Sequence, residues 1–197
     1  IHYTIDGKIP NKSSTVYSKP FSLNQSSMVK VIAIQDGFIP SYIENVSYYK
    51  LPYEINITYH EPYSSQYTAG GDKGLFDTIR RISTAWGAWQ GWQGNDFDAT
   101  INLGEPRNVH SITATFLQNA VSWIWLPKIV SFSVSSDGTR FQNIKQLNHE
   151  ISLREYTPTI LDFKTNIDMQ IQFVRIQAKN IEACPDWHPD RRRHYQR

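Results

Sequence analysis

The sequence predicts an all-β protein, and three observations support this prediction. Aromatic residues are abundant, with 6 Trp, 11 Tyr and 9 Phe in 197 residues, and aromatic residues favour strands. Short stretches of alternating polar and apolar residues recur between turns that contain Gly, Pro or Asp. No segment with helical periodicity alternates with these stretches, which argues against an α/β enzyme fold. The single cysteine, Cys184, also excludes a disulfide scaffold.

Residues 1–50 have the pattern of a small β-sandwich with four or five short strands and without its opening strand. Three of the predicted strands lie at 2–5, 29–34 and 42–49, with turns at Asp6-Gly7 and Asp36-Gly37. The sequence Lys50-Leu51-Pro52 is a plausible seam, so we expect a second domain over residues 51–197.

The second domain carries the spacing of a sandwich or jelly roll. Its Gly104-Glu105-Pro106 segment should end one strand, and Asp137-Gly138 should turn the chain after another. The expected strands are 55–59, 98–103, 109–117, 129–135, 159–163 and 170–178.

The charge distribution argues against nucleic acid as a partner. The formal charge is +2, but Arg191, Arg192, Arg193 and Arg197 lie in the last eight residues with Asp190. Without these eight, 16 of the 20 basic and 17 of the 18 acidic residues remain, which is a net charge of −1. No apolar run approaches the ~18 residues that a membrane helix needs, so we expect no membrane insertion.

Common catalytic motifs are absent from the sequence, including phosphate-binding glycine loops and the G-x-S-x-G and H-E-x-x-H patterns. Asp96 and Asp98 could in principle form a glycosidase carboxylate pair, but solvated acids at a strand entrance are the favoured interpretation. Cys184 and His188 could form a nucleophile–base pair, but no third group orients them. We therefore expect no enzyme activity from this chain.

The glycine-rich segment 70–86 is a candidate calcium loop. Asp72, Asp77, Ser83 and Thr84 supply oxygen atoms there, and flexible backbone carbonyls can add more. The alternative is an ordinary long loop held by Asx turns, because the spacing is not that of an EF-hand.

Three tryptophans lie in loops that also carry polar residues suited to sugar hydroxyls. These are Trp86, Trp123 and Trp187, and Trp187 lies between two prolines in a segment with Asp186 and His188. A flat ring can stack on the C–H face of a pyranose, while filling of the core is the competing interpretation for any tryptophan.

The first part of the chain resembles the C-terminal β-sandwich of bacterial chitobiases and β-hexosaminidases. The resemblance covers residues 1–50 and rests on two turn motifs, formed by Tyr3, Thr4, Asp6, Gly7 and Pro10 and by Tyr17, Pro20 and Phe21.

The second part is similar to a discoidin domain, the coagulation-factor type C domain that overlaps in bacteria with carbohydrate-binding module family 32. The similar segments include WQGWQGNDFDATINLG, the SWIWLPKIVSFSVSSDGTRF block and CPDWHP. This domain order resembles the region that follows the catalytic barrel of family 20 glycoside hydrolases in Bacteroidetes-like enzymes. The resemblance implies an Ig-like β-sandwich followed by a galactose-binding-like β-jelly roll, from an exported bacterial protein of the periplasm, outer membrane or cell surface.

The resemblance also implies site residues. Asp77 matches an acidic calcium position, with Ser83 or Thr84 nearby, but Thr78 stands where the family has glycine and the C-terminus departs from the family's last strand. Trp86, Trp123 and Trp187 become candidate sugar platforms, with Asp186 and His188 as hydroxyl partners.

Three hypotheses follow for function. The first is a non-catalytic module that binds terminal galactose-, N-acetylgalactosamine- or N-acetylglucosamine-type sugars and tethers a parent catalytic domain, with at least one exposed tryptophan. The second is a structural spacer that positions that domain, with every tryptophan buried and an exposed apolar patch elsewhere. The third is an independent hydrolase.

Overall fold

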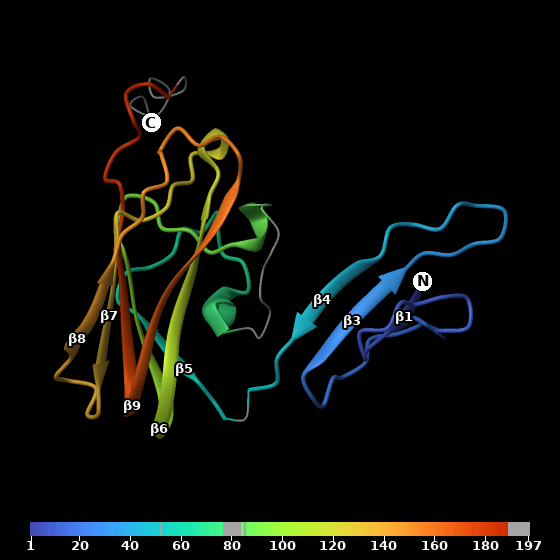
Figure 1. Cartoon of the computed structure of the whole chain (residues 1–197), viewed down its shortest axis with the longest axis horizontal. Helices are drawn as coiled ribbons and strands as arrows, with labels where there is room; N and C mark the ends of the chain where they lie inside the picture. Colours follow the sequence, from blue (N-terminus) through green and yellow to red (C-terminus); the bar gives the residue numbers. More distant parts are fainter. Residues whose placement is uncertain (52, 77–83, 85, 189–197) are drawn as a thin grey trace. The chain divides into compact units, whose positions relative to one another are not determined.

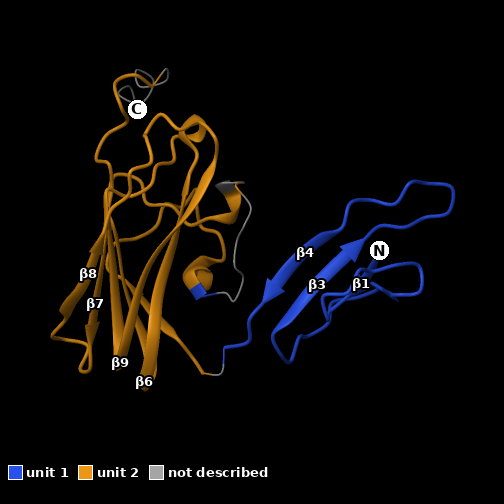
Figure 2. Ribbon diagram, viewed as in Figure 1, with its two compact units in different colours: residues 1–52, 76–81 blue, residues 53–75, 82–197 orange. Residues whose placement is uncertain are grey.

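The computed structural model describes residues 1–51, 53–76, 84 and 86–188, except for the side chain of Trp86. All extended elements are antiparallel strands, and the helical segments are short 3₁₀ turns, so the predicted all-β class is confirmed (Figure 1). The chain divides into two compact units, with the main boundary after residue 52 (Figure 2). None of the described helices has the length and apolar character to cross a membrane.

Unit 1 contains one four-stranded antiparallel sheet with the order β2-β1-β3-β4. At the predicted Asp6-Gly7 turn, Gly7 has a φ of 78° and donates its N–H to the Met28 carbonyl at 3.0 Å. The aromatic rings of Tyr3 and Phe21 stack at 4.8 Å beside the sheet. The strands are β1 (His2–Thr4), β2 (Thr15–Val16), β3 (Ser27–Ile32) and β4 (Glu44–Tyr48).

Unit 2 contains a five-stranded antiparallel pairing with the order β5-β6-β9-β7-β8. Its strands are β5 (Asn56–Tyr59), β6 (Phe97–Gln118), β7 (Ile129–Ser135), β8 (Gln142–Leu147) and β9 (Thr159–Lys179). The 3₁₀ turns are η1 (Gly71–Phe76), η2 (Trp86–Ala88) and η3 (Ala120–Ser122). The sequence predictions located neither β2, β8 nor the three 3₁₀ turns, because these residues carry no strong periodic pattern.

The long strands β6 and β9 fold back on themselves and form two layers. Phe97 and Phe116 lie 19 residues apart, about 60 Å along a straight strand, yet their ring centroids are 6.2 Å apart. Figure 1 shows both strands reaching the lower end of the unit and returning. The expected separate strands at 98–103 and 109–117, and at 159–163 and 170–178, are therefore joined as two halves of β6 and of β9.

The fold in β6 lies at the segment that sequence analysis assigned to a strand end. The pairing with β9 is irregular between Asn102 and Arg107, and Gly104 has a φ of 82° that favours glycine. Gln172 Nε2 donates to the Gly104 carbonyl at 3.3 Å, and Arg107 Nε donates to the Leu103 carbonyl at 3.1 Å. These bonds satisfy backbone carbonyls at the bend, so the chain turns without ending the strand.

The hydrophobic core of unit 2 lies between the two layers. Alternate residues of β6 and β9 point inward from both halves, as the period of two predicts. The fully buried residues include Phe132 and Val130 on β7 and Ile101 on β6. Both ends of β6 and of β9 consequently lie at the upper end of the unit in Figure 1, where three loops gather.

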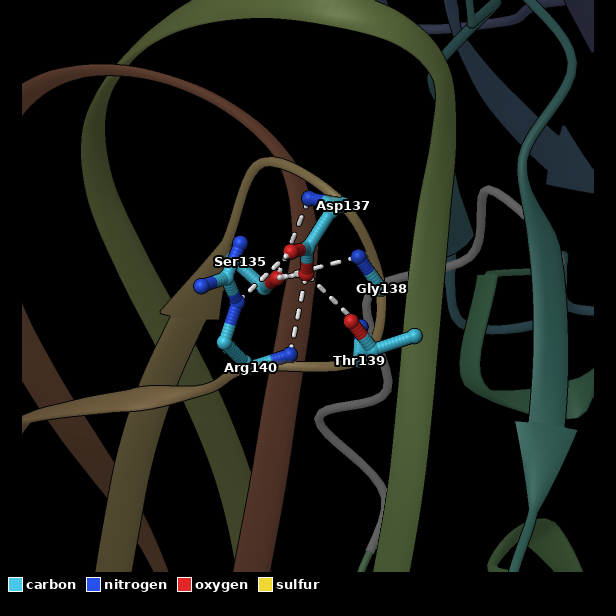
Figure 3. A network of polar contacts seen from close by, with 5 residues as sticks. All are labelled: Ser135, Asp137, Gly138, Thr139 and Arg140. Carbon is cyan, nitrogen blue, oxygen red and sulfur yellow. Dashed lines mark hydrogen bonds and ion pairs between the residues drawn. The ribbon is translucent and has the colours of Figure 1, made fainter.

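The predicted Asp137-Gly138 turn joins β7 to β8 at the lower end of the unit in Figure 1, and Figure 3 shows it from close by. The Asp137 carboxylate accepts hydrogen bonds from the backbone N–H groups of Thr139 and Arg140, both at 2.9 Å, and from the Ser135 hydroxyl. These bonds hold the pKa of Asp137 well below its usual range. The carboxylate is therefore part of a closed turn network, and we assign it no role in binding.

Candidate functional site

Three segments meet at the upper end of unit 2, and we call this group the loop-end cluster. They are residues 119–128 after β6, residues 149–158 before β9 and residues 181–188 at the described end of the chain. Figure 1 shows η3, the loop before β9 and the end of the chain gathered there. The cluster unites two of the predicted tryptophans with residues that sequence analysis did not select.

The first segment is a tight loop with an unusual backbone at Trp123. Asn119 and Ile124 exchange two backbone hydrogen bonds, of 2.9 and 3.1 Å, which close the loop. Trp123 follows η3 with φ 63° and ψ 32°, a left-handed conformation that is rare for a bulky residue. Strain of this kind is often found at functional sites, because the surrounding structure must hold the residue in place.

Gln118 joins the first and second segments beneath the surface. Its side chain is completely buried, and its Nε2 donates to the Ser152 carbonyl at 2.8 Å. Its Oε1 accepts the Leu126 N–H at 3.5 Å. Trp125 adds a second link, because its indole Nε1 donates to the Leu153 carbonyl at 3.1 Å. The two loops are therefore fixed to each other by buried polar contacts.

His188 lies at the centre of the cluster. Its side chain is 5% exposed, and its Nε2 donates to the Ala120 carbonyl at 3.0 Å. The ring centroids of Trp123, Trp125 and Trp187 lie 5.3, 5.7 and 5.8 Å from the imidazole centroid. Burial and the bond to Ala120 make His188 a packing centre for the tryptophans. Its predicted role as a hydroxyl partner stays a prediction.

Trp187 and the exposed residues around it form the more exposed side of the cluster. The ring of Tyr156, which is 52% exposed, makes an edge contact with Trp187 at 6.1 Å between centroids. The Arg154 guanidinium carbon lies 5.1 Å from the centroid of Trp187. Asp186 is exposed on the neighbouring position of the chain. The aromatic surface of Trp187 and Tyr156 is thus combined with the Arg154 cation.

Three members of the site, Arg154, Tyr156 and Trp125, were not predicted from the sequence. Arg154 and Tyr156 lie in a loop without a recognisable motif, and Trp125 was not among the three candidate platforms. The only local signal was the closeness of Trp123 and Trp125 in sequence. Arg154 and Tyr156 contact Trp187, and Trp125 contacts His188. Each partner lies about thirty residues or more away in the sequence, so no local pattern could reveal these contacts.

The other tryptophans belong elsewhere or cannot be placed. Trp86 was a predicted platform, but its side chain lies outside the described residues. Trp92 packs at 4.6 Å against Phe97, and its indole donates to the Glu61 carbonyl at 3.0 Å, which fits the role of a core residue. The five tryptophan side chains that the structure describes are all half-buried. Exposure alone therefore does not decide between the sugar-binding and spacer hypotheses.

The predicted calcium residues are only partly described. Asp77 and Ser83 lie outside the described residues, and Thr84 is exposed. Asp72 accepts a hydrogen bond from the Tyr63 hydroxyl at 2.7 Å, which leaves its second oxygen for other ligands. The part of the chain that the structure describes contains no group of three or more acidic, His or Cys side chains suited to a metal. Calcium stays a prediction.

The carboxylate pair considered for glycoside hydrolysis is held in ion pairs. Arg175 binds the Asp98 carboxylate through two bonds of 2.9 and 2.7 Å, and Lys179 lies 3.0 Å from Asp96. Burial raises the pKa of each aspartate, but these cations and the hydrogen bonds from Gln177 and Asn180 outweigh burial and lower both values. A general acid needs a raised pKa, so this pair is poorly suited to that role.

Comparison with solved structures gives several distant likenesses. CpGH89CBM32-5 from Clostridium perfringens, solved in complex with GalNAc-β-1,3-galactose, is 16% identical with a TM-score of 0.39, covering 64% of this chain and 84% of its own. The C-terminal domain of a chitobiase from Bacteroides fragilis is 14% identical with a TM-score of 0.39, covering 64% and 83%. CBM32-3 from a family 31 glycoside hydrolase of C. perfringens is 13% identical with a TM-score of 0.39, covering 63% and 77%. Likenesses of this strength carry no functional conclusion.

Comparison with family models is more decisive. Among curated proteins, none matches this chain. Residues 1–48 match the Fn3 associated family, and residues 56–192 match the F5/8 type C domain. Because the second match covers more than half of the 197 residues, the chain belongs to the F5/8 type C, or discoidin, family.

Proposed function

We propose that this chain is a non-catalytic carbohydrate-binding region and that the loop-end cluster holds a terminal sugar. The observation that carries the proposal is the gathering of Trp123, Trp125 and Trp187 around His188, with Arg154 and Tyr156 at the rim. Membership of the F5/8 type C family supports it, because bacterial discoidin domains resemble carbohydrate-binding module family 32.

The chemistry of the cluster suits a pyranose. An aromatic ring takes the apolar C–H face of the sugar, and Trp187 and Tyr156 form such a surface. Arg154 supplies hydrogen-bond donors at its edge, and Asp186 supplies acceptors. Buried contacts through Gln118 and His188 fix the loops before the ligand arrives, which reduces the entropy cost of binding.

The parent protein in this proposal is an exported bacterial β-N-acetylhexosaminidase or chitobiase of glycoside hydrolase family 20. A single site of this kind binds in the millimolar range, about 4 kcal/mol. Several sites on one glycan surface then add avidity, and the attached catalytic domain stays near its substrate. A structural calcium ion held near Asp72, Asp77, Ser83 and Thr84 is part of the same proposal.

Titration calorimetry tests the proposal. The chain is titrated with galactose, N-acetylgalactosamine, N-acetylglucosamine and chitobiose, with and without EDTA. We expect millimolar binding of at least one sugar and at least tenfold weaker binding by Trp187→Ala. Trp123→Gly removes a second ring while glycine accepts the left-handed backbone, so the loop keeps its conformation.

Phe38→Ala is the matched control, because it removes a 70% exposed aromatic ring from unit 1. It should leave binding unchanged, and circular dichroism should show that all three variants are folded. A flat titration at tens of millimolar for every sugar contradicts the proposal. Release of chromophore from a chromogenic N-acetylglucosaminide by this chain would instead identify a hydrolase.

The alternative function, a structural spacer, is favoured by a separate observation in unit 1. Phe38, Ile39 and Tyr42 are 70, 95 and 93% exposed in the loop between β3 and β4. An apolar loop of this kind suits contact with another protein domain. If no sugar binds, and the region raises the thermal stability of its parent catalytic domain, the spacer function is the better description.

A further inference from the structure

Arg154 differs from the other arginines whose side chains the structure describes. Arg107 pairs with Glu105, Arg140 with Asp137 and Arg175 with Asp98, at 3.0, 3.2 and 2.7 Å. Arg154 is exposed and has no carboxylate within ion-pair distance among the described residues. Its guanidinium carbon lies 5.1 Å from the centroid of the Trp187 ring. Among the described residues, Arg154 is thus an arginine of the cluster that forms no ion pair with a carboxylate.

This arrangement leaves the Arg154 guanidinium suited to bind a ligand. Stacking on an aromatic ring restricts the long side chain while leaving its N–H groups at the edge available for hydrogen bonds. The planar fork of these groups matches the two oxygen atoms of a carboxylate or the oxygens of a sulfate. Tyr156 lies 6.1 Å from the same indole, so the cation stands beside the proposed sugar platform.

Three acidic residues of the cluster already have other interaction partners. Glu155 accepts the Thr157 N–H at 2.8 Å, which lowers the pKa of Glu155. Glu182 lies 3.6 Å from Lys128. Asp186 also has an interaction partner, so it is not free. None of these carboxylates is bound to Arg154, and an acidic group on the ligand would meet a guanidinium with unused donors.

We infer that the sugar held by the loop-end cluster carries an acidic group, a carboxylate or a sulfate, and that Arg154 is the specificity-determining residue that receives it. The inference rests on the proposed function and names its substrate class. In this arrangement the ring of the acidic sugar lies against Trp187 or Tyr156, and its anionic group forms paired hydrogen bonds with the Arg154 guanidinium.

Matched pairs of sugars test the inference by titration calorimetry on the full chain. Galacturonic acid is compared with galactose, N-acetylglucosamine-6-sulfate with N-acetylglucosamine, and sialyllactose with lactose. These pairs separate uronic acid, sulfate and sialic acid as sources of the anion. At least one acidic member should bind tenfold or more tightly than its neutral partner, and raising the salt concentration should reduce this preference.

Three variants identify the residue responsible. Arg154→Gln should abolish the acid preference while neutral sugars keep weak binding, and Arg154→Lys should keep only part of it, because lysine lacks the planar fork. Arg140→Gln is the matched control, since it removes the same charge from the turn at the opposite end of unit 2. It should leave the preference intact.

The outcomes separate the two proposals. Equal binding of acidic and neutral sugars by the unaltered chain overturns the inference but leaves the proposed function in place. An acid preference that survives Arg154→Gln overturns the assignment to Arg154. No binding of any sugar overturns both, because the inference depends on the site.

Discussion

The two units of this chain differ sharply in how much they bury. In unit 2 most of the buried hydrophobic side chains form one core that spans both layers of β6 and β9. Among residues 1–51 of unit 1, only Pro10 and Ser27 are buried. Its apolar side chains, Tyr3, Tyr17 and Phe21 among them, contact one another at the side of a single sheet.

This difference teaches that regular strand pairing and an independent core are separate properties. Each apolar side chain that is fully buried contributes about 1.5–3 kcal/mol, and unit 2 has many such side chains. Unit 1 is hydrogen-bonded in the same antiparallel way but gains little from burial. We therefore expect unit 2 to determine the stability that is measured on the chain. Four predictions test or refine this comparison.

The largest effect is expected from Phe132→Ala. Phe132 is completely buried on β7, so the change should lower the free energy of unfolding of unit 2 by about 3–5 kcal/mol. Urea unfolding followed by tryptophan fluorescence measures this, because all six tryptophans lie at or after residue 86. Phe21→Ala, at a 43% exposed ring in unit 1, should leave that transition unchanged. A loss below about 1 kcal/mol for Phe132→Ala would contradict the described core.

Calcium should give the next largest effect if the loop over residues 70–86 binds it. At a concentration of 100 times Kd, a bound ion raises the free energy of unfolding by about 2.7 kcal/mol. Differential scanning calorimetry with calcium and with EDTA should show a shift in the unit 2 transition. Asp77→Asn should reduce the shift, and magnesium should not replace calcium. Identical transitions in calcium and in EDTA would refute the calcium prediction.

Asp98→Asn should have a smaller effect that depends on pH. Burial raises the pKa of Asp98, but the opposite effect of Arg175 and Gln177 is larger. The pKa in the folded state therefore lies below the unfolded value of about 3.9. The carboxylate therefore stabilises unit 2 above about pH 4, and this contribution is lost as the pH falls through the folded pKa. We expect a cost of about 1–2 kcal/mol near pH 7 that largely disappears near pH 2.

Urea unfolding at the two pH values measures this difference. Asp168→Asn is the control, because Asp168 is 88% exposed and forms only a surface contact with His110. Its effect should be small at both pH values. If Asp98→Asn lowered the free energy of unfolding equally at both pH values, the ion pair between Asp98 and Arg175 would not stabilise the pairing of β6 with β9.

The smallest effect on stability is expected from Ile39→Ser in unit 1. Ile39 is 95% exposed, so the free energy of unfolding should change by less than about 0.5 kcal/mol. Light scattering should show less self-association, because the change removes apolar surface from an exposed loop. A loss of more than about 1 kcal/mol would mean that unit 1 packs its β3–β4 loop against another part of the protein.

The sequence by itself determined the all-β class and several turns. Alternation of apolar and polar residues is a local property, so Ile129–Ser135 was predicted as the strand that the structure contains. The turn at Asp137-Gly138 followed from residue types that favour it, and its network of bonds lies within six residues. Trp123, Trp187 and His188 were selected for their loops, and they do lie together.

Only the tertiary structure decided which residues complete the loop-end cluster and which predicted strands are joined into one long strand. The bend at Gly104 is stabilised by Gln172, 68 residues away. Because this partner is distant, the local residues Gly104-Glu105-Pro106 predict a strand end instead of a bend. Arg154 reaches Trp187 only because both layers of β6 and β9 bring their ends to one side of the unit. Pairing of distant segments depends on the whole core, and no local pattern of residues records it.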